Sequence, residues 1–259
     1  MAQLRAVVTG ASSGIGAAVV QALTGQGWQV IAAARRQDRL AELAERTGCL
    51  PIRCDVTDPD DIAALRDYVE STGSGLHTLV NNAGFALGFD TVEDGDVDDW
   101  RAMFETNTIG TMRVTQALLP ALRESGRGDL VFMTSTAASG TYPGGGGYVA
   151  AKHAMGALAR TMRLELVGEP LRVIEIAPGM VHTEEFSVHR ARGDQARADA
   201  VYAGVAEPLT ADDVAECVRW AVSLPHHINI DTLIVRPRAQ AAQHLVARAA
   251  AAPLTPGVG

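Results

Sequence analysis

The sequence predicts an α/β protein with a single domain, a doubly wound parallel sheet of seven strands flanked by helices. Short runs rich in Val, Ile and Ala recur along the chain, and each precedes a longer stretch with apolar residues three or four positions apart. The short runs are almost continuously apolar, which is typical of strands covered on both faces. We therefore expect strands to alternate with helices around one parallel sheet over residues 1–238.

The expected elements follow this alternation from the N-terminus onward. Apolar runs bounded by polar or turn residues predict seven strands, over Arg5–Thr9, Gln29–Ala34, Pro51–Cys54, Thr78–Asn81, Asp129–Thr134, Arg172–Ala177 and Thr232–Arg236. Helical periodicity predicts six helices, over Gly16–Thr24, Asp38–Thr47, Asp60–Ser71, Trp100–Glu124, Val149–Val167 and Ala211–Ser223. The weakly periodic, charged connection that follows the sixth strand predicts a substrate lid at about 180–209. The Ala-rich tail at 239–259 predicts a short helix that frays.

Composition excludes several classes of protein. The 259 residues include 22 Lys and Arg against 30 Asp and Glu, and a net charge of −8 disfavours a nucleic-acid partner. Three cysteines without C-x-x-C spacing indicate free thiols in a reducing compartment. No signal-peptide pattern precedes the first strand, and no apolar run is long enough for a membrane span. With no clustered Cys and His, we expect a cytoplasmic protein without a metal or a membrane anchor.

The first strand leads into a glycine-rich turn, T-G-A-S-S-G-I-G at residues 9–16. A dinucleotide pyrophosphate needs backbone N–H groups at a helix N-terminus, and side chains there would block its approach. The turn therefore predicts a dinucleotide site, with the alternative that it only packs the helix on the strand. The candidate cofactor residues are Gly10, Ser12, Ser13, Gly14, Ile15 and Gly16.

Two arginines follow the second strand, where NAD-binding proteins place an acid that binds the adenosine ribose. A guanidinium at Arg35 cannot accept a hydrogen bond from a ribose hydroxyl, but it pairs bidentately with a 2′-phosphate, and Arg36 adds charge. This pattern favours NADP as the cofactor. The alternative is that both arginines only solvate the end of a strand.

Tyr148 and Lys152 lie four residues apart near the start of a predicted helix, so they share one face. An adjacent ammonium stabilises a phenolate, and we expect Lys152 to lower the pKa of Tyr148 toward neutrality. Ser135 follows the fifth strand, at the edge where open α/β sheets bind ligands. A Tyr-x-x-x-Lys pair alone occurs by chance on many helices.

Six short motifs follow one another along the chain: T-G-A-S-S-G-I-G at 9–16, N-N-A-G at 81–84, N-T-I-G from Asn107, Ser135, Y-V-A-A-K at 148–152 and P-G at 178–179. Together they resemble the short-chain dehydrogenase/reductase family over residues 4–238. The resemblance implies a Rossmann-type sheet in the order 3-2-1-4-5-6-7, a homotetramer, and a catalytic tetrad of Asn107, Ser135, Tyr148 and Lys152. It implies a proton exchanged by Tyr148, a substrate oxygen held by Ser135, ribose hydroxyls bound by Lys152 and a relay water held by Asn107.

The same resemblance implies further cofactor contacts. Asp55 and Val56 are expected at the adenine, and Asn82, Ala83 and Gly84 along the adenosine. Pro178, Gly179 and Thr183 are expected at the nicotinamide.

The substrate is expected from a closer resemblance, to the NADP-dependent 3-hydroxy acid (serine and allo-threonine) dehydrogenases, carried by V-I-A-A-A-R-R-Q-D-R-L, the lid string T-E-E-F-S-V-H-R-A-R-G-D and the stretch from Leu209 to Leu233. Arg190 is the preferred partner for a substrate carboxylate over Arg192, with a solvated loop face as the alternative. Tyr142, in the loop where the resemblance implies the substrate pocket, is a further candidate. Gly144–Gly147 departs from the family pattern, so these glycines either make room for a bulkier substrate or form a flexible turn. A ketoreductase for a larger ketone and a non-catalytic NADP-sensing protein remain alternatives.

Overall fold

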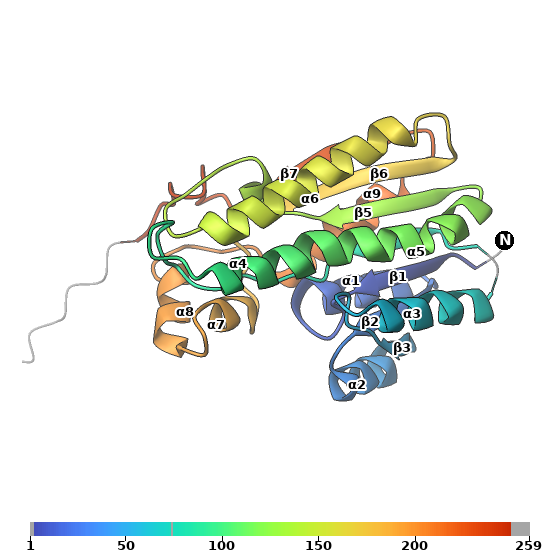
Figure 1. Ribbon diagram of the computed structural model, residues 1–259, viewed down its shortest axis with the longest axis horizontal. Coiled ribbons are helices and arrows are strands. Elements are labelled where there is room, and N and C mark those ends of the chain that lie inside the picture. The colour runs from blue at the N-terminus through green and yellow to red at the C-terminus, as the bar shows by residue number, and fades with distance from the viewer. Residues whose placement is uncertain (1–2, 74, 250–259) are drawn as a thin grey trace, which may run out of the picture.

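A computed structural model of the chain describes residues 3–73 and 75–249, and these form one sheet flanked by helices (Figure 1). The sheet order is β3-β2-β1-β4-β5-β6-β7, and all pairs are parallel. The strands are β1 (Arg5–Thr9), β2 (Gln29–Ala34), β3 (Leu50–Arg53), β4 (Thr78–Asn81), β5 (Gly128–Met133), β6 (Leu171–Pro178) and β7 (Thr232–Val235). The predicted fold class and strand order are confirmed.

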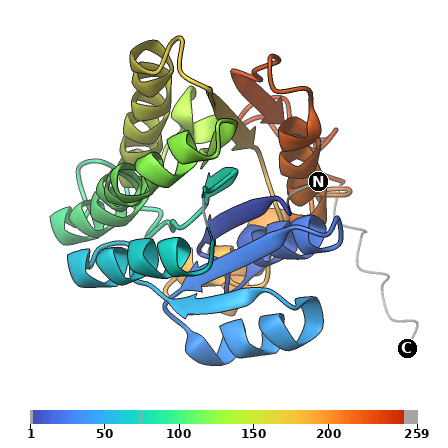
Figure 2. The same ribbon diagram turned by 90° about the vertical axis from the view of Figure 1, so that its right-hand side faces the viewer.

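Helices cover both faces of the twisted sheet (Figure 2). One face packs against α1 (Gly14–Thr24), α2 (Gln37–Thr47) and α9 (Ala211–Ser223). The opposite face packs against α3 (Pro59–Ser71), α5 (Thr111–Glu124) and α6 (Gly146–Glu165). Helix α4 (Val97–Phe104) packs beside α6 at the end of the molecule where the strands terminate.

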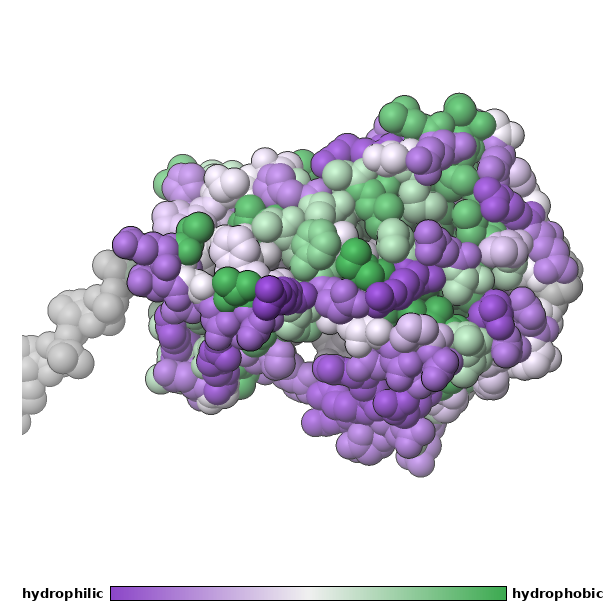
Figure 3. Space-filling view, in the orientation of Figure 1, coloured by the Kyte–Doolittle hydropathy of each residue, from purple (hydrophilic) through white to green (hydrophobic). Residues whose placement is uncertain are grey.

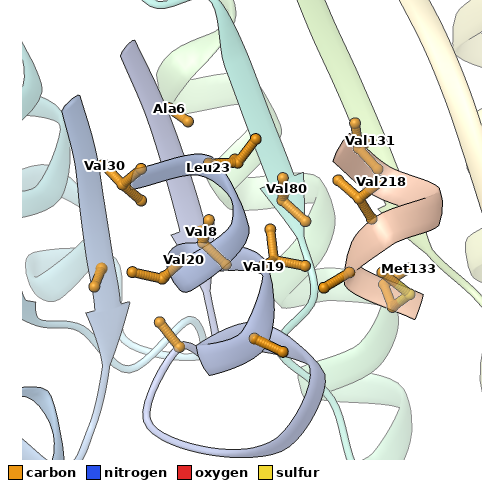
Figure 4. Packing of buried hydrophobic residues seen from close by; sticks show 14 of the residues in the cluster. Ala6, Val8, Val19, Val20, Leu23, Val30, Val80, Val131, Met133 and Val218 are labelled. Atoms are coloured by element: carbon orange, nitrogen blue, oxygen red, sulfur yellow. The ribbon is translucent and has the colours of Figure 1, made fainter. Parts of the chain in front are cut away.

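Each strand sends neighbouring side chains to opposite faces, which explains the continuous apolar runs. Val8 packs with α1 and α9 in one core cluster (Figure 4), whereas Val7 belongs to the cluster under α3 and α5. Val8 stands level with Ala32 on one neighbouring strand and with Val80 on the other. The two buried layers hold the carboxyl ends of the strands in register, and the site is built on these ends.

The stretch predicted as one helix over Trp100–Glu124 differs from the prediction. Between α4 and α5, the chain forms a π-helical segment, η1 (Glu105–Gly110). A Cβ on Gly110 would come within 2.8 Å of Val56 Cγ2, so this segment approaches the end of β3 more closely than a side chain allows. A wider π turn changes the direction of side chains within an otherwise continuous helix, and Asn107 lies in this turn.

The lid and the tail also differ from expectation. The lid contains two short helices, α7 (Phe186–Arg190) and α8 (Gln195–Tyr202), separated by Arg192 in a left-handed conformation (φ 56°). Over 239–249 the tail forms no helix, because its polar groups bond elsewhere: Arg248 donates to the Val201 carbonyl at 3.0 Å, and the Ala249 amide donates to the carbonyl of Gly204 at 2.7 Å. The predicted tail helix is therefore wrong there, and residues 250–259 lie outside the described part. Among residues 3–73 and 75–249, no helix has the length and apolarity that crossing a bilayer requires.

Candidate active site

One large cleft runs along the carboxyl ends of the strands, with a volume of about 1330 Å³. This exceeds the roughly 300–1,000 Å³ typical of a small-ligand pocket, which leaves room for a dinucleotide together with a substrate. The glycine turn and the ends of β2 to β6 form its floor, and the lid and residues 240–248 form its far wall. Figure 3 shows the molecule hollowed between the lid and the surface formed by α2 and α3.

The glycine turn fits the pyrophosphate of a dinucleotide. Gly10 has a φ of 65°, and an added Cβ would approach Ala83 Cα to 2.8 Å, so a side chain here would push β1 and β4 apart. Gly14 begins α1 with a φ of 52° and faces Thr183 of the lid, whose Cγ2 would lie 3.5 Å from an added Cβ. The backbone therefore offers a helix N-terminus at a bare surface of the cleft, where anions bind. Ser12, Ser13 and Ile15 line this end of the cleft too.

The two arginines after β2 differ in their surroundings. Arg35 is exposed and borders the cleft. Arg36 donates to the Ser12 hydroxyl from Nη2 at 2.9 Å and from Nε at 3.2 Å, and it forms a bidentate ion pair with Glu185 of the lid. Hydrogen bonding to Glu185 raises the pKa of Arg36, against a smaller effect of burial. Arg36 thus joins the glycine turn to the lid.

The expected adenosine contacts line the cleft beside these arginines. Asp55 accepts hydrogen bonds through Oδ1 from the Thr57 amide at 3.0 Å and from its hydroxyl at 2.7 Å. Asn82 donates through Nδ2 to the Thr9 carbonyl at 2.9 Å, which fixes the end of β4 against the glycine turn. Val56, Ala83 and Gly84 lie along the same wall.

At the other end of the cleft, the structure brings Ser135 and Tyr148 together. Ser135 follows β5 and caps a short helical turn, with its Oγ accepting from the Ala137 amide at 3.1 Å. Tyr148 lies in the first turn of α6, and the Phe186 ring of the lid packs edge-to-face on it at 5.8 Å between ring centroids. Pro178 ends β6 beside this pair, Gly179 follows it, and both line the cleft.

Lys152 and Asn107 are buried behind Tyr148. Lys152 is 4% exposed and donates through Nζ to the Met133 carbonyl at 2.8 Å. Burial lowers its pKa to about 8. The Asn107 amide pairs with the backbone of Phe85, with Oδ1 accepting and Nδ2 donating at 2.9 Å each. A Cβ on Gly84 would lie 2.6 Å from Asn107 Oδ1 and 3.5 Å from Lys152 Nζ, so Gly84 stands between these two side chains.

The expected lowering of the tyrosine pKa is wrong for this structure. Burial raises the pKa of Tyr148 well above its ordinary value, and the hydrogen bond with Ser135 opposes this only in part. Lys152 Nζ lies 5.9 Å from the centroid of the tyrosine ring and is turned to a backbone carbonyl, so its charge does not outweigh the burial. Tyr148 is therefore a protonated phenol at neutral pH.

The two candidate arginines of the lid, Arg190 and Arg192, differ in whether they line the cleft. Arg190 lines the cleft, donates to the carbonyls of Gly88 and Gly144 at 2.9 Å each, and reaches the Tyr142 hydroxyl at 3.3 Å. Its guanidinium also lies over the Phe89 ring, 4.4 Å from the centroid. Arg192 instead pairs with Asp99 on α4 and does not line the cleft.

The four glycines before Tyr148 neither widen the pocket nor leave a loose turn. A Cβ on Gly144 would approach the Phe89 carbonyl oxygen to 2.6 Å, and one on Gly146 would meet Trp100 at 2.7 Å. Gly145 likewise packs under the Tyr142 ring. The run allows two aromatic rings and a backbone segment to pack directly on the start of α6.

Sequence reasoning missed several residues that line the cleft. Glu185 and Phe186 stand in the lid string that carries the subfamily resemblance, where only the arginines were assigned a role. No spacing along the chain indicated that Glu185 would pair with Arg36. Gln240 accepts from the Met180 amide at 2.8 Å, and Gln243 donates to the Thr136 carbonyl, so the tail closes the substrate end. No spacing in the tail indicated this contact.

A glycine turn at one end of the cleft and a Ser–Tyr–Lys group at the other place the chain among the oxidoreductases. The family model for short chain dehydrogenase matches residues 5–192, and the chain belongs to this family. An uncharacterized oxidoreductase of Mycobacterium tuberculosis is 52% identical over 91% of this chain and 92% of its own length. An NADP-dependent 3-hydroxy acid dehydrogenase of Escherichia coli is 37% identical over 90% and 95%. A closed serine dehydrogenase complexed with NADP⁺ superposes with a TM-score of 0.89 and 36% identity, over 95% of this chain and all of its own.

Proposed function

We propose that this protein is an NADP(H)-dependent oxidoreductase that interconverts a short 3-hydroxy acid and its carbonyl counterpart. The observation that carries the proposal is the placement of Tyr148 and Ser135 at one end of a dinucleotide-sized cleft, with Arg35 and Arg36 at the other. The arginines suit a phosphate on the adenosine ribose, because a guanidinium binds phosphate bidentately. Relatives that use NADP support the same choice of cofactor.

Each residue of the tetrad has a role that follows from its position. The cofactor, when bound, supplies or accepts the hydride. In reduction, Tyr148, which is protonated at neutral pH, donates its phenolic proton to the carbonyl oxygen. Ser135 holds the same oxygen through its hydroxyl. In oxidation, Tyr148 must first lose its phenolic proton, and the phenolate then accepts the proton from the substrate hydroxyl.

Lys152 and Asn107 act from behind the tyrosine. With a pKa of about 8, Lys152 is charged at neutral pH, and its ammonium stabilises the phenolate left after Tyr148 gives up its proton. We propose that it also binds the nicotinamide ribose. Because the Asn107 amide is committed to the Phe85 backbone, a relay water toward Lys152 would bind beside Gly84, which stands between the two side chains.

Arg190 supports an acidic substrate, because its guanidinium lines the cleft at the end that holds Tyr142. A carboxylate that enters there gains a charge-assisted hydrogen bond in exchange for the long contact to the tyrosine hydroxyl. The 3-hydroxy acid dehydrogenase relative is consistent with this substrate class.

A second candidate is a ketoreductase for a larger ketone, and the aromatic lining of the cleft favours it. Besides Tyr148, five phenylalanine and tyrosine rings line the cleft, from Phe85, Phe89, Tyr142, Phe186 and Tyr202. The two backbone carbonyls already bound by Arg190 also reduce its capacity for a carboxylate. Such a wall buries a bulky apolar substrate better than a small acid.

A panel of carbonyl compounds, assayed with NADPH by its absorbance, separates these candidates. Turnover of short 3-oxo acids or their aldehyde analogues, with poor turnover of bulky ketones, is the expected result. The reverse preference would establish the ketoreductase. Tight NADPH binding without turnover of any compound would indicate a cofactor-sensing protein instead.

A further inference from the structure

A closed network of polar side chains joins the lid to the phosphate end of the cleft. Glu185 Oε1 accepts from Arg36 Nη1 at 2.8 Å, and Glu185 Oε2 accepts from Arg36 Nη2 and from the Ser13 hydroxyl at 2.8 Å each. Arg36 Nη2 also donates to the hydroxyls of Ser12 and Ser13 at 2.9 Å. One carboxylate therefore accepts three hydrogen bonds from residues far away in sequence.

The donors in this network, a guanidinium and two hydroxyls, are of the chemical types that bind phosphate in proteins. A bidentate guanidinium with adjacent hydroxyls at a glycine turn is a typical oxyanion site. Glu185, Arg36 and both serines line the cleft, so the carboxylate occupies the cleft rather than the outer surface. Hydrogen bonding from Arg36 lowers the pKa of Glu185, with burial opposing it, so the group is ionised at neutral pH.

A negative charge on Glu185 repels a second anion at the same donors. The side chains of Arg36 and Glu185 are 42% and 36% exposed, so water can replace either partner and the ion pair is readily opened. A phosphate that carries two charges competes well for Arg36, whereas a ribose hydroxyl has no charge with which to displace the carboxylate.

We infer that Glu185 is an internal competitor for the 2′-phosphate of the cofactor, which must displace this carboxylate to reach Arg36 and the two serine hydroxyls. This inference rests on the proposed use of NADP. In the cofactor-free protein, Glu185 holds the start of α7 against the glycine turn. The 2′-phosphate takes over Arg36 and the serine hydroxyls from Glu185. NAD lacks this phosphate and leaves the contact intact.

The test compares the dissociation constants of NADP⁺ and NAD⁺, and of 2′,5′-ADP and 5′-AMP as fragments, for the wild type and Glu185→Gln by calorimetry. Glu184→Gln is the matched control, because it makes the same change of charge at an exposed neighbouring position. Glu185→Gln is expected to lower the dissociation constants of NADP⁺ and 2′,5′-ADP by about three- to tenfold. The dissociation constants of NAD⁺ and 5′-AMP are expected to stay unchanged. Glu184→Gln is expected to leave the ratio of NADP⁺ to NAD⁺ affinity unchanged.

Four results would overturn the inference, and they differ in whether the use of NADP fails with it. If Glu185→Gln weakens NADP⁺ binding, Glu185 closes over a bound cofactor instead of competing with it, and an equal effect on NAD⁺ would exclude a role at the phosphate. A wild type that binds 5′-AMP but not 2′,5′-ADP would instead contradict the proposed use of NADP. The inferred role of Glu185 as a competitor would then fail as well. A wild type that binds NADP⁺ tightly, with unchanged affinity in Glu185→Gln, removes only the competitor.

Discussion

Removing the charge on Lys152 should slow carbonyl reduction by an amount that can be worked out from the structure. Its Nζ lies 5.9 Å from the centroid of the Tyr148 ring, and Lys152 is 4% exposed. If the phenolate charge is placed at the ring centroid and the effective dielectric constant is roughly 20, the two unit charges interact by about 3 kcal/mol. Lys152→Met removes this stabilisation of the phenolate and is expected to lower kcat for carbonyl reduction about a hundredfold at saturating NADPH.

The pH profile of the wild type tests the same charge without a mutation. Because the pKa of Lys152 is about 8, the ammonium is lost as the pH rises through that value. The kcat/KM for NADPH, which reports groups of the free enzyme, should fall above about pH 8, and this inflection should be absent in Lys152→Met. A variant that keeps most of the wild-type kcat, or that retains the inflection, would refute the assignment.

Unfolding experiments provide the control for this variant. The folded pKa of Lys152 lies below its ordinary value of 10.5, so the unfolded chain holds that proton more tightly. Stability should therefore rise with pH between about 8 and 10.5 in the wild type, with no such rise from this group in Lys152→Met. At pH 7 the free energy of unfolding of the variant should exceed that of the wild type by about 1–3 kcal/mol. This net value combines the gain from removing a buried charge with the loss of the hydrogen bond to a backbone carbonyl. A loss of activity in a more stable protein cannot be attributed to misfolding.

Four further substitutions test other parts of the site. Tyr148→Phe should lower kcat by about 10²- to 10⁴-fold with an unchanged Kd for NADPH, and a small loss would mean that another group moves the proton. Arg35→Asp should shift the kcat/KM ratio from NADPH toward NADH by about tenfold or more, and an unchanged ratio would remove Arg35 from phosphate recognition. Arg190→Met should raise KM for acidic substrates more than for neutral carbonyls, because it removes a charge present in the ground state; equal rises would show that it only holds the lid. Gly144→Ala and Gly126→Ala both place alanine at a φ near 70° (71° and 69°), but only the former meets a backbone carbonyl, so chemical denaturation should show an additional loss of about 1–3 kcal/mol for Gly144→Ala.

The regular part of the fold was predictable because its signals are local. A strand buried on both faces is apolar along most of its length, with polar residues at its ends, so β1, β2 and β4 were predicted to the residue. The interruption of the long helix by η1 was not predicted, because apolar residues resume at Ile109 and Met112 after the polar residues 105–108, as they would in a continuous helix. The approach of Gly110 to Val56, which lies more than fifty positions earlier, accompanies the change of pitch.

The chemistry-bearing residues were predictable to the same extent. The spacing of Tyr148 and Lys152 alone places them on one helix face. The glycine turn can be recognised because it stands between a predicted strand and a predicted helix. Their electrostatics were not predictable, because burial outweighs the spacing: the pKa of Tyr148 is raised where a lowered one was expected. The partner of Arg36 was also missed, since Glu185 lies 149 positions away.

By itself, the sequence determined the order of strands and helices, the glycine turn and the tyrosine–lysine pair, because these depend on residues within one turn or one strand of each other. Only the tertiary structure decided what each charged group faces. It turned Lys152 to a backbone carbonyl, Arg190 to two others, and Glu185 onto Arg36. Charge interactions depend on distance and burial, and neither quantity is contained in the spacing of residues along a chain.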